Sequence, residues 1–192
     1  MTDNTRYNPQ IHHRRSIRLK GYDYSRTGAY FITICAYNRL CLFGEIIDGE
    51  MRANPCGETA AACWRDLPRH FETITLGDWV VMPNHIHGIL VIGRGEASAV
   101  ESLKKTNPMA ADASPLRPNG TQSGSLGAIV QNYKSVAARR INILRGASGV
   151  PVWQRNYWEH IIRDEASYGD LTRYILNNPK QWTMDRLFAG AS

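Results

Sequence analysis

Residues 79–92 have the sequence WVVMPNHIHGILVI, in which Pro83 and Asn84 separate two apolar runs. Proline followed by asparagine favours a tight turn, so the pattern predicts two antiparallel strands, near residues 73–82 and 85–92. Side chains alternate between the two faces of a strand, and His85 and His87 therefore point the same way. Such a pair is typical of a two-ligand metal site, although two partly buried strand histidines give the same pattern.

A second pattern lies near the C-terminus, where residues 174–179 have the sequence YILNNP. Asp164 or Ser167 is suited to cap a helix through this segment, and Pro179 is expected to end it. Tyr174 and Asn178 are four residues apart and share one helix face. Two imidazoles and an amide oxygen, with no thiolate, favour Mg²⁺ or Mn²⁺ over a structural zinc ion.

Three motifs follow one another along the chain: residues 82–88 (MPNHIHG), 153–160 (WQRNYWEH) and 174–179 (YILNNP). Together they resemble the REP-associated tyrosine transposases, single-tyrosine transposases of the HUH (His-hydrophobic-His) endonuclease superfamily. The resemblance extends from about Gly28 to Asn178 and is interrupted by one long insertion.

The resemblance implies a metal-dependent single-strand DNA endonuclease and strand transferase. Tyr174 is the implied nucleophile, which forms a covalent 5′-phosphotyrosine on hairpin-containing repeat DNA, and His85, His87 and Asn178 are the implied metal ligands. The phosphotyrosine conserves the energy of the cleaved bond, so a second DNA end can be joined without ATP. The expected partner is single-stranded or hairpin DNA, bound by a monomer or a homodimer.

Other aromatic residues have less specific interpretations. Tyr168 begins the same helix but has Thr172, a weaker ligand than an amide, four residues later. Trp153, Tyr157 and Trp158 lie in a strand-like stretch, where they would either stack on unpaired bases or pack in the core.

The composition predicts one domain with a basic surface. The chain has 192 residues, 43% of them hydrophobic, and a formal net charge of +6, which favours a polyanionic partner. We expect a basic N-terminal arm over residues 1–24, which is either a solvated tail or a DNA contact, and a transposase domain over residues 25–192. The residues predicted to contact DNA are Arg14, Arg15, Arg18, Lys20, Lys134, Arg139 and Arg155.

The cysteines and the apolar segments indicate the compartment. Cys35, Cys41, Cys56 and Cys63 form no Cys-x-x-Cys pair, which excludes a thiolate-zinc deaminase and favours free thiols in a reducing environment. No stretch approaches the roughly 20 apolar residues that a membrane span needs, and the N-terminus lacks a signal peptide's apolar region. We therefore expect a cytoplasmic protein, nucleoid-associated when bound to DNA, with no membrane partner.

The order of predicted elements indicates an α+β fold. A strand over residues 29–36 and an inserted hairpin near residues 41–49 precede a helix from Pro55 towards His70 and the two strands described above. After a flexible insertion over residues 94–124 we expect a helix over residues 126–145, a strand over residues 153–162 and the terminal helix. This order is a ferredoxin-like βαββαβ sheet with an additional C-terminal helix, which can lie across the open face of the sheet.

Two other functions fit part of the pattern. The first is a non-catalytic nucleic-acid-binding module derived from a transposase, which would keep the scaffold and the basic surface. The second is a metallohydrolase in which the histidine pair activates water, although no general base beside the metal is evident. Replacing Tyr174 by phenylalanine separates the tyrosine mechanism from both.

Overall fold

The core of the protein is a four-stranded antiparallel sheet. The computed structural model describes residues 23–93 and 123–188, and its strands follow the order β4-β5-β1-β6. The strands of this sheet are β1 (Gly28–Cys35), β4 (Ile74–Met82), β5 (His85–Ile92) and β6 (Trp158–Ile162), and a separate hairpin consists of β2 (Gly44–Ile47) and β3 (Glu50–Ala53). The helices are η1 (Tyr37–Arg39), α1 (Pro55–Arg65), α2 (Leu67–His70), α4 (Leu126–Leu144), α5 (Glu165–Asn177) and η2 (Pro179–Met184).

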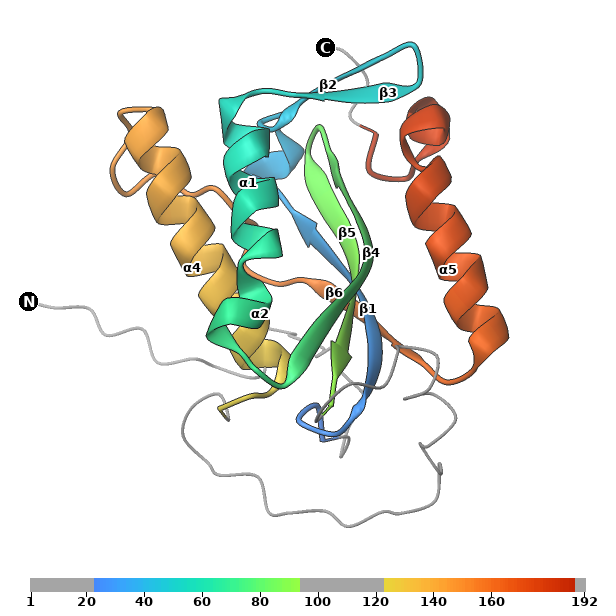
Figure 1. Ribbon diagram of the computed structural model, residues 1–192. Helices are drawn as coiled ribbons and strands as arrows, with labels where there is room; N and C mark the ends of the chain where they lie inside the picture. Colours follow the sequence, from blue (N-terminus) through green and yellow to red (C-terminus); the bar gives the residue numbers. More distant parts are fainter. Residues whose placement is uncertain (1–22, 94–122, 189–192) are drawn as a thin grey trace, which may run out of the picture.

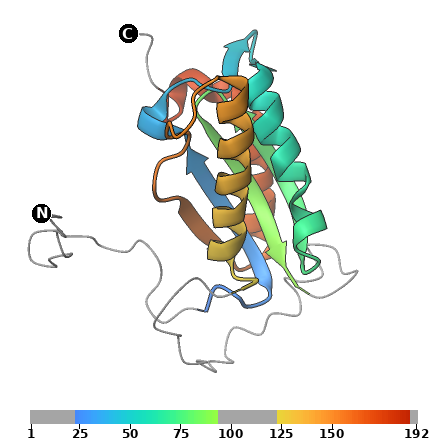
Figure 2. The same cartoon turned by 90° about the vertical axis from the view of Figure 1, so that its left-hand side faces the viewer.

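Helices cover both faces of the sheet. Helices α1 and α4 lie side by side on one face, and α5 lies alone on the other (Figure 1; Figure 2). A larger hydrophobic cluster lies under α1 and α4, and a smaller one lies under α5. The predicted ferredoxin-like fold, with its inserted hairpin and its additional C-terminal helix on the open face, is confirmed.

Local sequence signals explain where the elements begin. Asn54 caps α1, whose first residue is Pro55, and Ser125 caps α4. Asp164 caps α5 by accepting a hydrogen bond from the backbone nitrogen of Ser167, so Asp164 is the cap and Ser167 is not. A side-chain oxygen at this position satisfies a backbone donor that the first helical turn leaves free.

The central strand β5 is buried along its whole length. Ile86, Leu90 and Ile92 belong to the larger cluster, whereas Ile89 and Val91 belong to the cluster under α5. By strand alternation, His85 and His87 share the face that α5 covers. The register of β5 therefore directs both imidazoles towards the C-terminal helix.

Several predicted boundaries differ from the structure: the helix expected from Pro55 towards His70 is divided into α1 and α2, and the hairpin expected near residues 41–49 extends to Ala53. The strand expected over residues 153–162 begins only at Trp158, because Trp153 is buried in the core and pairs with Ala36 through an isolated bridge. Helix α5 ends at Asn177 as expected, but Pro179 also begins the 3₁₀ helix η2, since proline fits the first position of a helix. Residues 1–22 of the predicted N-terminal arm and residues 94–122 of the predicted insertion lie outside the described residues. In the described part of the chain, no helix is both long and apolar enough to cross a bilayer.

Candidate active site

His85 is held in one tautomer by its neighbour in the sequence. Its Nδ1 lies 2.8 Å from Oδ1 of Asn84, and Nδ2 of Asn84 donates to the carbonyls of Arg39 and Leu187 at 3.2 and 2.8 Å. Because the Asn84 amide nitrogen donates to these two carbonyls, the amide oxygen is the atom that faces the imidazole. This oxygen can only accept a hydrogen bond, so the proton of His85 is on Nδ1. Nε2 of His85 is buried and has no hydrogen-bond partner among the described residues. Burial lowers the pKa of His85 to about 4, partly opposed by Asp185, so this lone pair is available at neutral pH.

His87 lies beside His85, with its ring centroid 4.3 Å away. Nδ1 of His87 is 2.9 Å from the hydroxyl of Thr33, and its Nε2 is 3.2 Å from the hydroxyl of Tyr174. Burial and the neighbouring His85 hold the pKa of His87 well below its usual value. Both imidazoles are therefore neutral at pH 7, the state in which histidine binds a metal.

Helix α5 brings Tyr174 and Asn178 to the histidine pair, as their spacing predicts. Tyr174 is 40% exposed, and its hydroxyl donates to Oδ2 of Asp185 at 3.3 Å. Asn178 is 2% exposed; its Nδ2 donates to the same carboxylate oxygen at 2.8 Å, and its Oδ1 has no partner among the described residues. Burial, followed by the charge of Asp185 and its hydrogen bond, raises the pKa of Tyr174 to about 12, so the phenol is protonated at neutral pH.

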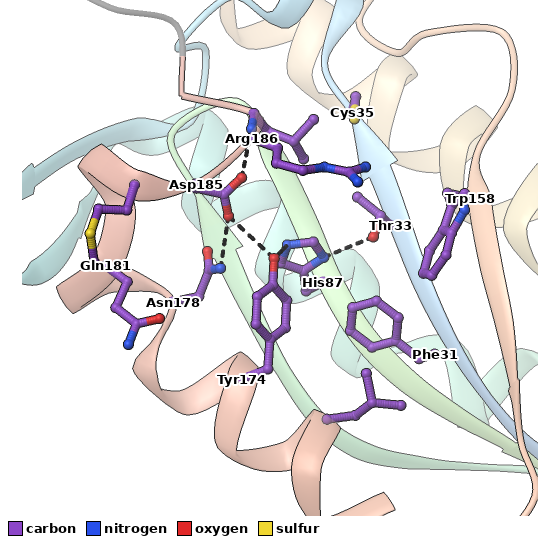
Figure 3. Close-up of a pocket in the computed structure, with 13 residues that line it drawn as sticks. Phe31, Thr33, Cys35, His87, Trp158, Tyr174, Asn178, Gln181, Asp185 and Arg186 are labelled. Carbon is purple, nitrogen blue, oxygen red and sulfur yellow. Dashed lines mark hydrogen bonds between the residues drawn. The ribbon is translucent and has the colours of Figure 1, made fainter. Parts of the chain in front are cut away.

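Asp185 is the site residue that the sequence did not indicate. It follows η2, and the backbone nitrogen of Leu187 fixes its Oδ1 by a 2.6 Å hydrogen bond. Its carboxylate accepts hydrogen bonds from Tyr174 and Asn178, and the imidazole of His87 lies beside these groups (Figure 3). The possible ligand atoms of His85, His87 and Asp185 all lie within 4.8 Å of one another. A lone aspartate after a proline-initiated turn has no pattern that marks it, and only the fold reveals its position.

The donor atoms in this site fit a divalent cation. Two buried polar atoms, Nε2 of His85 and Oδ1 of Asn178, lack partners among the described residues, and such atoms cost free energy unless something binds them. Nitrogen and oxygen donors suit Mg²⁺ or Mn²⁺. Cys35 lines the adjacent cavity, but burial raises the pKa of its thiol, so no thiolate competes for the metal at neutral pH.

A cavity of about 500 Å³ opens beside this cluster. His87, Tyr174, Asn178 and Asp185 lie on one side of it, and Phe31 and Trp158 extend from the sheet on the other (Figure 3). These side chains are therefore accessible to a ligand of nucleotide size.

Three of the residues predicted to contact DNA belong to the described part of the chain, and none of these three lines the cavity. Lys134 and Arg139 are on α4, on the face of the sheet opposite to α5 (Figure 1). Nζ of Lys134 donates to the carbonyls of residues 154 and 156 at 2.8 and 2.9 Å, whereas Arg139 and Arg155 are exposed. The remaining four, Arg14, Arg15, Arg18 and Lys20, lie outside the described residues. The contact of this set with DNA stays a prediction.

Comparison with known proteins shows the family of the chain. An uncharacterized protein of Haemophilus influenzae is 44% identical to it over 186 residues, which cover 96% of this chain and 98% of the other. This chain belongs to the same family. The Haemophilus relative and this chain match over nearly their full lengths, and no family model matches the chain.

Two solved structures resemble this chain. A REP-associated tyrosine transposase bound to a REP hairpin superposes with a TM-score of 0.55 over 90% of this chain and 77% of that one, at 17% identity. A candidate transposase of Deinococcus radiodurans covers 84% of this chain and 97% of its own, with 15% identity and a TM-score of 0.43. The likeness to the REP-associated tyrosine transposase confirms the fold predicted from the resemblance to that family.

Proposed function

We propose that this protein is a divalent-metal-dependent endonuclease and strand transferase that cuts single-stranded DNA beside a hairpin. The observation that carries the proposal is the position of the Tyr174 hydroxyl, 3.2 Å from Nε2 of His87 at the edge of an open cavity. The phenol lies within hydrogen-bond reach of a neutral imidazole and of the Asp185 carboxylate, which suits a nucleophile that an adjacent base must activate. The REP hairpin bound by the transposase of the same fold supports DNA as the partner.

The metal-binding residues of this proposal are His85, His87 and Asn178, and Asp185, whose Oδ2 accepts hydrogen bonds from Tyr174 and Asn178, serves as the proton acceptor. A bound Mg²⁺ or Mn²⁺ would withdraw charge from a non-bridging phosphate oxygen as the transition state develops. Asn84 keeps Nε2 of His85 free for this role. Hydrogen bonding of the second ring nitrogen is the usual way in which proteins orient a histidine ligand.

Tyr174 attacks the phosphorus atom in this mechanism. Its hydroxyl proton points at Oδ2 of Asp185, which accepts it as the bond between the phenolic oxygen and phosphorus forms. The bond between phosphorus and the 3′ oxygen breaks, and that oxygen takes up the proton from Asp185 to become a 3′ hydroxyl, which leaves the carboxylate ionised again. The products are a 5′-phosphotyrosine and a free 3′ end, and reversal with another 3′ end joins the strands. Because the pKa of Tyr174 is about 12, this proton transfer is essential at neutral pH.

The test is covalent capture of the DNA strand. We expect the protein, incubated with a labelled hairpin that carries a single-stranded extension and with Mn²⁺ or Mg²⁺, to form an adduct that survives denaturation. Tyr174→Phe removes only the hydroxyl and should abolish the adduct. Tyr168→Phe is the matched control, because this tyrosine lies on the same helix but outside the cavity beside Tyr174.

Any of three results would contradict the proposal. An adduct that persists in Tyr174→Phe would assign the nucleophile to another residue, and cleavage without an adduct would indicate attack by water. Binding without cleavage, for every hairpin and metal tried, would favour a non-catalytic DNA-binding module.

We further propose that the protein acts in the cytoplasm, bound to the nucleoid, as a monomer or a homodimer.

A further inference from the structure

An aromatic wall lies on the sheet side of the cavity. Trp158 extends from β6, the edge strand, and Phe31 from its neighbour β1. The ring of Phe31 meets those of Trp158 and Tyr174 edge to face, at centroid distances of 5.9 and 6.0 Å. Figure 3 shows Trp158 and Phe31 across the cavity from the cluster around Asp185. The aromatic wall therefore begins at the tyrosine and extends away from it across the sheet.

Register ties Trp158 to the histidine pair. Trp158 is directly opposite Thr33, and Thr33 is directly opposite His87. Opposite residues of antiparallel strands point to the same face, and neighbouring strands are about 4.8 Å apart. Trp158 and His87 thus lie in one row, about 10 Å apart across two strand spacings. A nucleotide whose phosphate lies beside Tyr174 can place its base over Trp158.

Trp158 is the most exposed tryptophan in the described part of the chain. It is 47% exposed, whereas Trp64, Trp153 and Trp182 are buried and Trp79 is partly buried against the core. Trp153 packs against Phe43 in the core, so of the two tryptophans in residues 153–160 only Trp158 presents its ring to a ligand. Tryptophan, which combines a large apolar ring with one polar N–H group, is enriched at binding interfaces.

One positively charged side chain, Arg186, also lines the cavity, next to the carboxylate of Asp185. Arg186 is close enough to Tyr174 for its charge to favour the phenolate. A guanidinium beside an aromatic surface is the combination with which proteins bind unpaired nucleotides, because it pairs with phosphate while the ring stacks on the base. A cavity of about 500 Å³ is large enough for one nucleotide.

We propose that this cavity binds an unpaired nucleobase next to the scissile phosphate, stacked on Trp158, with Arg186 on a phosphate of the same strand. The inference rests on the proposed function for the position of the scissile phosphate, but base binding itself needs neither metal nor cleavage. The stack would hold the strand so that the phosphorus faces Tyr174, which makes Trp158 a binding and positioning residue.

The experiment compares strands with and without bases in the presence of a chelator, so that no cleavage occurs. Fluorescence anisotropy measures the affinity of 12-nucleotide homopolymers of each base and of an abasic strand of equal length. Base stacking is worth about 1–3 kcal/mol. We therefore expect Trp158→Ala to weaken binding of at least one homopolymer about tenfold and to leave the abasic strand unchanged.

Two further variants control for folding and for general hydrophobic contact. Trp158→Phe keeps a stacking ring and should retain most of the affinity for the homopolymer. Tyr37→Ala removes an exposed aromatic of similar accessibility, 42%, that does not line the cavity, and it should have no effect. Equal losses for abasic and base-containing strands, or no preference of the wild type for any homopolymer over the abasic strand, would overturn the proposal.

The outcomes separate this inference from the proposed function. A covalent adduct together with base-independent binding would leave the transferase intact and reject the base site. Base-dependent binding through Trp158 without any adduct would establish the site and reject the tyrosine mechanism.

Discussion

Gly88 follows the histidine pair on β5, and the space beside it is already filled. A Cβ atom added at this position would lie 2.5 Å from Cζ2 of Trp64 and 3.0 Å from Cβ of Trp79. Carbon atoms in contact are about 3.5–4.0 Å apart. Trp64 is completely buried and meets the ring of Tyr133 edge to face at 5.2 Å, so it cannot withdraw without moving α1 or α4. Gly88→Ala should therefore strain the strand that carries both histidines.

The cost can be worked from these contacts. Overpacking of a core costs about 1–3 kcal/mol, and a 2.5 Å contact with a buried ring belongs near the upper end. The lower chain entropy of unfolded alanine offsets about 0.4–1 kcal/mol. A net loss of about 2 kcal/mol remains, and for a protein of this size it lowers the Tm by about 4–8 °C. Thermal unfolding followed by circular dichroism measures the change.

Two companion variants make the prediction specific. Gly169→Ala places the same methyl group on α5, where nothing lies within 4 Å, and should raise the Tm because alanine favours the helix by about 0.5–1 kcal/mol. Trp64→Phe removes the atom that Gly88→Ala would touch, so the added methyl should cost at least about 1 kcal/mol less in that background. An unchanged or higher Tm in Gly88→Ala, or an equal cost in both backgrounds, would refute the steric argument.

Two other predictions concern the histidine pair. Asn84→Ala removes the acceptor that fixes the tautomer of His85 and should weaken Mn²⁺ binding about 10- to 100-fold, as titration calorimetry can measure; unchanged affinity would show that the tautomer needs no such support. The pKa values of His85 and His87 are lowered in the folded state, so their contribution to stability is complete above pH about 6.5 and is lost as the pH falls towards the folded-state pKa of each group, which is about 4 for His85. Without metal, the free energy of unfolding should fall over this range by up to about 1.4 kcal/mol per pH unit for each histidine, as urea unfolding can show, and a slope that His85→Gln does not reduce would contradict this assignment.

The sequence was sufficient for the parts of the site that regular structure positions. Strand alternation placed His85 and His87 on one face, and helical spacing placed Tyr174 above Asn178. Those two periods, together with the cap at Asp164 and the turn at Pro83, are local signals that the fold preserves. The hairpin expected near residues 41–49 depends on a local signal as well, since Asp48-Gly49 is a pair typical of two-residue turns. In the structure both residues adopt positive φ angles, as such a turn requires.

The remaining parts depend on contacts between distant segments. Asp185 reaches Tyr174 only because η2 turns the chain back over the end of α5, and no periodicity marks such a turn. The sequence also left Trp153 and Trp158 equivalent, since both are aromatic residues in a strand-like stretch. The structure separates them: β6 begins only at Trp158, and Trp153 packs with Phe43 and Tyr133 in the core.

The order in which the site residues occur along the chain has a consequence for synthesis. His87 and Tyr174 are 87 residues apart, and ribosomes add about 5–20 residues each second. For roughly 4–17 s, a growing chain therefore displays the histidine pair before the phenol has been made. Under the proposed function, such a nascent chain has two of its metal ligands but lacks its nucleophile, so DNA cleavage would have to wait until α5 has been translated and docked.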